Sequence, residues 1–333
     1  SDTTRALGEL ARFNRNRSNL RVLAITGSNG KTSTRMLMDQ VISRTFSTLS
    51  TSGNLNNHIG LPLTLFRLTP GHQAAVVELG MNHAGEITRL GCICEPDVAV
   101  ITNVGPAHLE GLGSIENVAR AKGELLHTLR PGGLAILNGD DPRVAALAGT
   151  VDREVIYFGS GRRAQVRGED IRLTEGGMAF TLSTPAGSTR VALSTPARVM
   201  VSNALAAAAV SQALGVPLEE IKAGLEAFSP QAGRMGIRMV GRNIRLLDDT
   251  YNANPGSMAA AIETLARMRG TRRTLAVLGD MLELGPQSVA MHREIGRVVG
   301  KSRIDQLYVT GRFARNVGEG AVEQQMDADR IVT

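Results

Sequence analysis

The segment Gly27–Thr32 (GSNGKT) contains the residue types that hold phosphate groups in proteins. Its glycines allow backbone N–H groups to turn toward phosphate oxygens, and the N-terminus of a following helix adds a favourable dipole. Lys31 can reach the terminal phosphates, and the Thr32 hydroxyl can bind Mg²⁺. The usual loop begins with a glycine where this chain has Ile25, so the segment is a shortened variant. A simple glycine turn is the alternative, and we favour phosphate binding because a predicted strand leads directly into the segment.

Three titratable residues lie further along the chain. Glu78 ends the apolar run AAVVE, and His108 follows another such run at 97–105. Ligands of α/β sheets collect at the carboxyl ends of the strands, so beside a phosphate loop Glu78 is placed to hold Mg²⁺. Glu78 could instead be a solvated carboxylate, and a lone histidine such as His108 is often structural. Lys122 falls in a predicted helix, where spacing alone indicates a solvated lysine.

Three loops concentrate polar side chains. They contain Asn54, Asn56, Asn57 and His58 in GNLNNHIGLPL, the pair Asn82 and His83, and the run DDTYNANP at 248–255. Asparagine clusters often only make turns, but the same donors and acceptors could bind a polar substrate. Cys92 and Cys94 are interpreted as packing residues.

The composition narrows the class of protein. The 333 residues suggest two domains, and a net charge of +6 allows nucleic acid as a partner. Aromatic residues make up only 3%, without Trp, and the basic residues are dispersed, so we favour small anionic ligands over nucleic acid. We expect no membrane span, because the chain has no apolar run of about 18 residues. Two closely spaced cysteines and no secretion signal favour a cytoplasmic protein.

Short apolar runs that alternate with helical stretches must position these residues. A first unit is predicted to contain a helix (Thr3–Asn14), a basic connector (Arg15–Asn19), buried strands (Arg21–Thr26, Ala74–Gly80, Asp97–Gly105, Gly132–Asp141) and further helices (Ser33–Arg44, Ser114–Leu129, Ser202–Gly215). This alternation indicates a mostly parallel sheet with helices on both faces. Alternating runs between Val151 and Val191 indicate a small antiparallel patch.

A second α/β unit is predicted to begin near Met239. Its expected strands are 242–251, 272–281 and 305–311, and its expected helices are 256–268 and 288–300. We therefore predict an α/β protein with a P-loop central domain, followed by a partial Rossmann-like α/β domain.

Together these segments resemble the Mur ligase family, the ATP-dependent amide-forming enzymes of peptidoglycan synthesis. The matching stretches are TGSNGKTST, GNLNNHIGLPLT, ELGMNHAGEI, ITNVGPAHLEGLGS, ARAKGE, AGRM, DDTYNANPGSM and VLGDMLELG, which span Thr26 to Gly285. The phosphate loop and AKGE are shared across the family. NLNN, MNHAGEI and YNANP point to the activity that joins D-alanyl-D-alanine to UDP-N-acetylmuramoyl-tripeptide.

The resemblance implies roles that spacing does not show. The residues implied for ATP are Gly27, Ser28, Asn29, Gly30, Lys31, Thr32 and Ser33, with Asn203 at the adenine, Arg234 at the γ-phosphate and Asp249 or Asp248 at the ribose. Thr32 and Glu78 would bind Mg²⁺, and His108 and Lys122, the latter as its carbamate, would serve a second Mg²⁺. The two substrates would meet Asn54, Asn56, Asn57, Asn82, His83, Tyr251, Asn252 and Asn254. Lys31, Glu78, His108, Lys122 and Arg234 would form the catalytic set.

The resemblance also implies a domain layout and a reaction. Residues 1–20 would be a helix and linker from an N-terminal domain for the uridine nucleotide, 21–237 the central ATP-binding domain and 238–333 an incomplete ligase domain. Since the N-terminal domain is expected to lie outside this chain, we expect ligase activity to be weak or absent. ATP would phosphorylate the terminal carboxylate of the peptide, and the dipeptide amine would then attack the acyl phosphate, giving ADP and phosphate. We expect a monomer.

Two other interpretations remain open. One is a different Mur-type or folylpolyglutamate-type amino-acid ligase, against which the YNANP and NLNN segments weigh. The other is a P-loop nucleotide-binding module without ligase chemistry.

Overall fold

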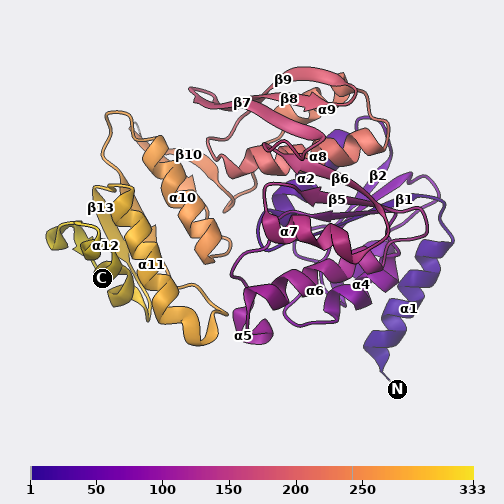
Figure 1. Ribbon diagram of the computed structural model, residues 1–333, viewed down its shortest axis with the longest axis horizontal. Helices are drawn as coiled ribbons and strands as arrows, with labels where there is room; N and C mark the ends of the chain where they lie inside the picture. The colour runs from indigo at the N-terminus through magenta and orange to yellow at the C-terminus, as the bar shows by residue number, and fades with distance from the viewer. Residues whose placement is uncertain (1, 242) are drawn as a thin grey trace. The chain divides into compact units, whose positions relative to one another are not determined.

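The computed structural model in Figure 1 describes residues 2–241 and 243–333. The chain forms two compact units: unit 1 comprises Ser1–Val104, Glu116–Ser194 and Val199–Phe228, and unit 2 comprises Gly105–Ile115, Thr195–Arg198 and Ser229–Thr333. Short segments from the first part of the chain thus belong to unit 2. The domain boundaries predicted after residues 20 and 237 remain predictions.

Unit 1 is built on a nine-stranded sheet with the order β2-β3-β1-β4-β5-β6-β7-β8-β9. Its strands are β1 (Arg21–Thr26), β2 (Thr48–Ser50), β3 (Ala74–Glu78), β4 (Val98–Ile101), β5 (Leu134–Asn138), β6 (Glu154–Gly159), β7 (Val166–Thr174), β8 (Gly177–Thr184) and β9 (Gly187–Leu193). Neighbours from β2 to β7 are parallel, and β7, β8 and β9 are antiparallel. The central strands β3, β1 and β4 are almost wholly buried, as their unbroken apolar runs predict.

The antiparallel patch predicted from Val151 onward is partly wrong. β6 pairs in parallel with β5 and extends the main sheet, and only β7 to β9 form antiparallel pairs. The run EVIYFG in β6 is nearly continuous in apolar residues, which is the pattern of a parallel strand, whereas β8 alternates between buried and partly exposed positions.

Helices cover both faces of this sheet. They are α1 (Thr3–Asn16), α2 (Lys31–Ile42), α3 (Gly60–Leu65), α4 (Glu86–Cys94), α6 (Ile115–His127), α7 (Pro142–Ala146), α8 (Val199–Ala213) and α9 (Leu218–Glu226), with a 3-10 turn η1 (Leu147–Thr150). Figure 1 shows α2 and α8 on one face of the strands and α4 and α6 on the other.

The connector predicted from Arg15 is wrong at its start. Arg15 is buried in α1, where its guanidinium donates to the carbonyls of Cys94 (2.8 Å) and Glu95 (3.2 Å).

Unit 2 contains a three-stranded parallel sheet and a separate two-stranded ribbon. Its elements are α5 (Leu109–Leu112), β10 (Gly236–Val240), β11 (Ile244–Asp248), α10 (Pro255–Arg267), β12 (Leu275–Leu278), η2 (Gly285–Gln287), α11 (Ser288–Lys301), β13 (Gln306–Val309), α12 (Ala314–Glu323), η3 (Ala328–Arg330) and β14 (Ile331–Val332). The strand predicted at 242–251 is confirmed as β11, which pairs with β10 in an antiparallel ribbon. Arg242, in that run, lies outside the described residues.

Glycines allow α11 and α12 to pack closely. A Cβ atom at Gly296 would lie 1.9 Å from the Val317 carbonyl oxygen, and one at Gly320 would lie 1.9 Å from that of Arg293. The backbones of α11 and α12 therefore lie in direct contact, which a side chain at either glycine would prevent.

Candidate functional site

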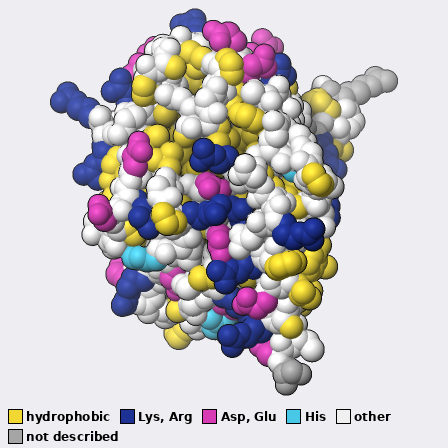
Figure 2. All heavy atoms as spheres, turned by 90° about the vertical axis from the view of Figure 1, so that its right-hand side faces the viewer, with side chains coloured by type: hydrophobic (Ala, Val, Ile, Leu, Met, Phe, Trp, Pro, Cys, Tyr) yellow, Lys and Arg dark blue, Asp and Glu magenta, His cyan; other side chains and the backbone are white. Residues whose placement is uncertain are grey.

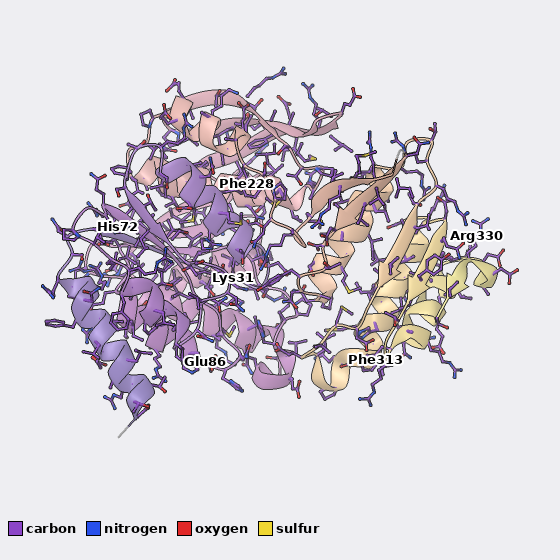
Figure 3. All side chains as sticks on the ribbon, turned by 180° about the vertical axis from the view of Figure 1, so that it is seen from behind. Lys31, His72, Glu86, Phe228, Phe313 and Arg330 are labelled. Atoms are coloured by element: carbon purple, nitrogen blue, oxygen red, sulfur yellow. The ribbon has the colours of Figure 1, made fainter. Side chains whose placement is uncertain are left out.

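The predicted phosphate loop joins β1 to α2 in unit 1. Gly27 (φ +152°) and Gly30 (φ +80°) adopt backbone conformations that favour glycine, and a Cβ at Gly27 would lie 1.9 Å from the Thr102 hydroxyl oxygen. Lys31 is the first residue of α2, and Figure 3 labels its position. Its ammonium donates to the carbonyl oxygens of Gly27 (2.8 Å) and Ser28 (3.3 Å). The strand, the glycine loop and the helix N-terminus therefore have the arrangement that binds phosphate.

The end of the neighbouring strand β4 holds this loop in place. The Asn103 side chain accepts a hydrogen bond from the Asn29 N–H (2.9 Å) and donates to the Asn29 carbonyl (3.0 Å). The Thr102 hydroxyl donates to the same carbonyl at 2.7 Å. Our sequence reasoning missed Thr102 and Asn103, although their position directly after the buried run VAVI was a usable signal.

Asn203 in α8 also lies against the loop. Its side chain is 7% exposed, and a Cβ at Gly30 would lie 2.5 Å from its amide oxygen. The structure therefore brings Asn203 to the predicted nucleotide loop, while its role at the adenine remains a prediction.

Glu78 ends β3, the strand next to β1, and is 2% exposed. One carboxylate oxygen accepts from the Asn56 amide at 2.9 Å, and the other lies 3.6 Å from Arg35 Nε. That second oxygen, Oε2, has no hydrogen-bond partner in the described part of the chain. The alternative of a solvated carboxylate is therefore wrong, because Glu78 is buried and oriented by its neighbours.

Lys122 in α6 is 1% exposed, so the solvated lysine indicated by its spacing is wrong. Burial lowers the pKa of Lys122 well below its usual value, and the positive charge of Lys31 lowers it further. A buried ammonium without a counter-ion is costly, so the neutral amine is favoured here. A helical position does not reveal this burial, since it arises from the packing of α6 against the sheet.

These residues fit a magnesium site that is completed by phosphate and water. Among residues 2–241 and 243–333, no group of three His, Cys, Asp or Glu side chains could hold a metal ion by itself. Mg²⁺ is usually held by one or two carboxylates together with phosphates and water. The orphaned Glu78 Oε2 and the buried hydroxyl-bearing residue Thr32, 5% exposed, suit that arrangement.

The predicted substrate asparagines of unit 1 have different surroundings. The Asn56 amide donates to Glu78, and its carbonyl accepts the Gly80 N–H, so both contacts are made to the end of β3. The Asn57 side chain accepts the N–H groups of Ile59 and Gly60, which makes a local turn before α3. Asn54 is exposed.

The loop that carries Asn82 and His83 is held by two glutamates that sequence reasoning missed. Glu86 accepts the backbone N–H groups of Asn82 (2.7 Å) and His83 (3.2 Å). Glu124, from the AKGE segment, accepts the Gly85 N–H at 2.7 Å. Both predicted side chains are exposed on a loop whose backbone is fixed.

Unit 2 gathers a second group of predicted residues. The Arg234 guanidinium lies over the Tyr251 ring, 4.0 Å from its centroid. Asp249 accepts the Met235 N–H at 3.0 Å, and burial raises the pKa of Asp249 to about 6. A hydrogen bond from the Thr250 hydroxyl helps to lower the pKa of Asp248.

The asparagines of the same loop make local contacts. The Asn254 side chain accepts the Ser257 N–H and caps α10, and the Asn252 side chain accepts the neighbouring Ala253 N–H. Capping uses the Asn254 oxygen, so its contact with substrate remains a prediction.

His108 also belongs to unit 2, where it precedes α5. Its backbone is left-handed (φ +57°), and its Nδ1 lies 2.6 Å from Glu283 Oε2. Because Glu78 and Lys122 belong to unit 1, the predicted metal set is divided between the two units.

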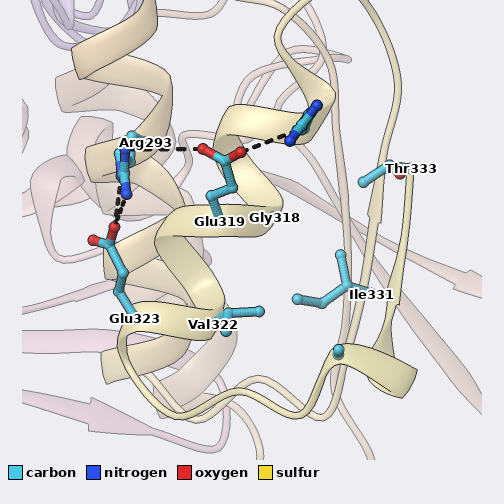
Figure 4. Close-up of a pocket in the computed structure, with 9 residues that line it drawn as sticks. Arg293, Gly318, Glu319, Val322, Glu323, Ile331 and Thr333 are labelled. Carbon is cyan, nitrogen blue, oxygen red and sulfur yellow. Dashed lines mark hydrogen bonds and ion pairs between the residues drawn. The ribbon is translucent and has the colours of Figure 1, made fainter.

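A pocket of about 450 Å³ lies elsewhere in unit 2, between α12 and the C-terminal segment (Figure 4). Its charges pair with one another: Arg293 with Glu323 and Glu319, and Arg315 with Glu319 at 3.0 Å. None of the predicted site residues lines it.

On the face in Figure 2, basic side chains are interspersed with acidic and apolar ones. None of the described helices is long and apolar enough to cross a bilayer.

The two cysteines differ in burial. Cys94 is buried, as its predicted packing role requires, but Cys92 is exposed, so the same interpretation of Cys92 is wrong.

Comparison with known families decides the assignment. The model of the Mur ligase middle domain matches residues 25–211, and that of the Mur ligase glutamate ligase domain matches residues 233–332. The chain belongs to the Mur ligase family. The α/β fold and the family predicted from the sequence are thereby confirmed.

This Mur ligase is similar to curated and solved relatives over its whole length. It is 42% identical over 336 residues to the UDP-N-acetylmuramoyl-tripeptide–D-alanyl-D-alanine ligase of Escherichia coli (strain K12), covering 100% of this chain and 74% of the relative. The crystal structure of MurF from Acinetobacter baumannii superposes with a TM-score of 0.93 at 38% identity, covering 99% of this chain and 71% of that one. MurF from Thermotoga maritima, solved in complex with ADP, gives a TM-score of 0.89 at 28% identity, covering 100% and 74%.

Proposed function

We propose that this Mur ligase uses ATP to join D-alanyl-D-alanine to UDP-N-acetylmuramoyl-tripeptide. The observation that carries the proposal is the 42% identity, over the whole chain, to a ligase of that name. The phosphate loop at β1 and the buried Glu78 and Lys122 supply the machinery that such a reaction needs. The loops with Asn54, Asn82 and Tyr251 are the proposed substrate contacts.

The reaction has two steps. A carboxylate oxygen of the tripeptide attacks the γ-phosphorus of ATP, ADP leaves, and an acyl phosphate forms. The dipeptide amine then attacks the acyl carbon, inorganic phosphate leaves, and the amine loses a proton. Lys31 and the loop N–H groups stabilise the charge on the transferred phosphoryl group, and Arg234 is proposed to act on the γ-phosphate.

Thr32, Glu78, His108 and Lys122 are the proposed residues for Mg²⁺. When bound, Mg²⁺ offsets negative charge on the phosphates during transfer. Glu78 contributes a buried carboxylate that Arg35 and Asn56 orient. Because the side chain is already ordered, the oxygen without a hydrogen bond can bind a metal ion at little further cost in conformational entropy.

Lys122 is proposed to act as its carbamate. The neutral amine attacks CO₂, a C–N bond forms, one proton is released, and the product carries a carboxylate-like anionic group. Burial and the charge of Lys31 both favour the neutral amine that this step requires. An ammonium could not bind a cation, whereas the carbamate oxygens are hard ligands suited to Mg²⁺.

Labelled bicarbonate tests the modification. The lysines of the chain are Lys31, Lys122, Lys222 and Lys301. We expect one ¹³C carbamate resonance that persists in Lys222→Ala, whose lysine is paired with Glu226 on a helix surface, and that disappears in Lys122→Ala. A resonance that survives Lys122→Ala would contradict the assignment.

ADP release tests the function itself. We expect release to require ATP, the tripeptide substrate and D-alanyl-D-alanine together. Release that ignores the dipeptide would support a nucleotide-binding module without ligation, and release driven by a single amino acid would support another member of the family. A cytoplasmic location is part of the proposal, since ATP and both free cysteines suit a reducing compartment.

A further inference from the structure

The contact between His108 and Glu283 joins two loops of unit 2 that lie far apart in the sequence. His108 Nδ1 is 2.6 Å from Glu283 Oε2, and the Glu110 N–H donates to the Glu283 carbonyl at 3.0 Å. The Glu283 residue thus holds both the imidazole ring and the backbone beside it. An ionised carboxylate can only accept hydrogen bonds, so Nδ1 must be the donor, and the neutral ring then has its lone pair on Nε2.

Both residues of this contact adopt a left-handed backbone without being glycine. His108 has φ +57° and Glu283 has φ +62°. Such a conformation is unfavourable for a non-glycine residue, because its Cβ crowds the following carbonyl oxygen. It persists where the surrounding structure imposes it, and such sites are often functional. Here the two strained residues face each other.

Hydrogen bonds from buried and neighbouring side chains hold the loop that carries Glu283. His292, buried in α11, accepts the Met281 N–H at Nε2 (2.9 Å) and makes a 2.7 Å hydrogen bond to the Ser288 carbonyl through Nδ1. Asp280 accepts the N–H groups of Arg312 and Phe313. Glu283 therefore projects from a fixed base.

We propose that Glu283 is a positioning residue that fixes the Nδ1–H tautomer and the ring orientation of His108. The contact is unsuited to a role in stability, because the Glu283 side chain is 50% exposed, and exposed ion pairs contribute little. Its effect is on the imidazole: Nε2 becomes the acceptor and the potential metal ligand. This effect on metal binding rests on the proposed function of His108 as a metal ligand. The tautomer itself follows from the contact between His108 and Glu283.

Nitrogen NMR of the ¹⁵N-histidine-labelled chain tests the proposal, with His108 assigned from His108→Gln. We expect the Nδ1–H tautomer in the unaltered chain and a shift toward Nε2–H in Glu283→Asn. Asn tolerates a left-handed backbone but is shorter and uncharged. Glu110→Gln, which changes an exposed carboxylate in α5 next to His108, is the matched control and should leave the tautomer unchanged.

If Glu283→Asn does not fold, Glu283→Gln replaces it, and its weaker amide acceptor should also shift the tautomer. An unchanged tautomer in the folded variant overturns the proposal.

Mn²⁺ binding, followed by electron paramagnetic resonance, separates this proposal from the metal role of His108. Loss of a residue that orients a metal-binding histidine typically weakens metal affinity about 10–100-fold. We expect weaker binding in both His108→Gln and Glu283→Asn. Binding unchanged in His108→Gln would refute the metal role of His108 and leave the tautomer result standing. Binding that depends on His108 but not on Glu283 would overturn the positioning role.

Discussion

The phosphate-loop region of unit 1 and the 248–255 loop of unit 2 build their polar sites in opposite ways. In unit 1, Glu78 and Lys122 are buried, and the loop backbone is held by Thr102 and Asn103. In unit 2, Tyr251 is 52% exposed, and the Asn252 and Asn254 side chains accept N–H groups from nearby residues in the sequence, Ala253 and Ser257. Substitutions of these buried residues in unit 1 should therefore damage folding together with binding, whereas substitution of the exposed Tyr251 in unit 2 should affect binding alone.

The largest difference is expected between two ion pairs. Glu78→Gln removes the carboxylate that lies 3.6 Å from the buried Arg35, and breaking a buried pair in this way costs about 3–5 kcal/mol of unfolding free energy. Asp248→Asn removes the carboxylate that pairs with Arg238. The Arg238 side chain is 56% exposed, so the variant should lose about 0–1 kcal/mol of unfolding free energy. Urea unfolding of the two variants measures both values. Equal losses would show that burial does not distinguish the two regions.

Gly30→Ala sharpens the comparison within unit 1. The added Cβ meets Asn203 at 2.5 Å, and the φ of +80° strains alanine, so we expect a loss of about 1–3 kcal/mol in stability and no measurable nucleotide binding. Gly53→Ala is the control, because it carries a similar φ of +55° with no atom within 4 Å. Nucleotide affinity measured by calorimetry should be normal in the control. Normal affinity in Gly30→Ala would mean that the loop is not the phosphate site.

These contrasts also explain how far the sequence could be interpreted. The phosphate loop and the end of β3 at Glu78 were predictable, because strand, turn and helix follow from local residue patterns. The burial of Lys122 was not, since a lysine in a helix is usually solvated and only the packing of α6 removes it from water. The parallel pairing of β6 and the hydrogen bonds from the Asn103 side chain to the Asn29 backbone likewise depend on which strands become neighbours. Residue spacing does not encode this.

A smaller effect is expected in unit 2 from Tyr251→Leu. The variant keeps apolar bulk but removes the aromatic face under Arg234, a contact worth about 0.5–2 kcal/mol. If Arg234 acts on the γ-phosphate, ATP affinity should fall by that amount while thermal stability stays unchanged. The control is Tyr308→Leu, a partly exposed tyrosine in β13 of the same unit. A loss of stability without a loss of affinity would contradict the division between the two regions.

A further effect concerns pH. Burial raises the pKa of Asp249 from its ordinary 3.8 to about 6, so the folded chain holds this proton more tightly than the unfolded chain. The resulting stability is fully present below about pH 3.8 and is lost as the pH rises through about 6. Asp249→Asn should therefore remove this decline, seen as a smaller drop in Tm between about pH 4 and pH 7. An identical pH profile in the variant would show that Asp249 is not buried in solution.

Calorimetric titration with ATP tests the central claim most directly, namely that unit 1 binds the nucleotide through its phosphate loop. Lys31→Ala removes the ammonium at the start of α2, and Lys222→Ala removes one from the surface of α9. Charge-assisted hydrogen bonds to phosphate are about twice as strong as neutral ones, so their loss should be severe. We predict that Lys31→Ala abolishes or greatly weakens ATP binding and that Lys222→Ala binds as the unaltered chain does. Equal ATP affinity in all three proteins would contradict the account.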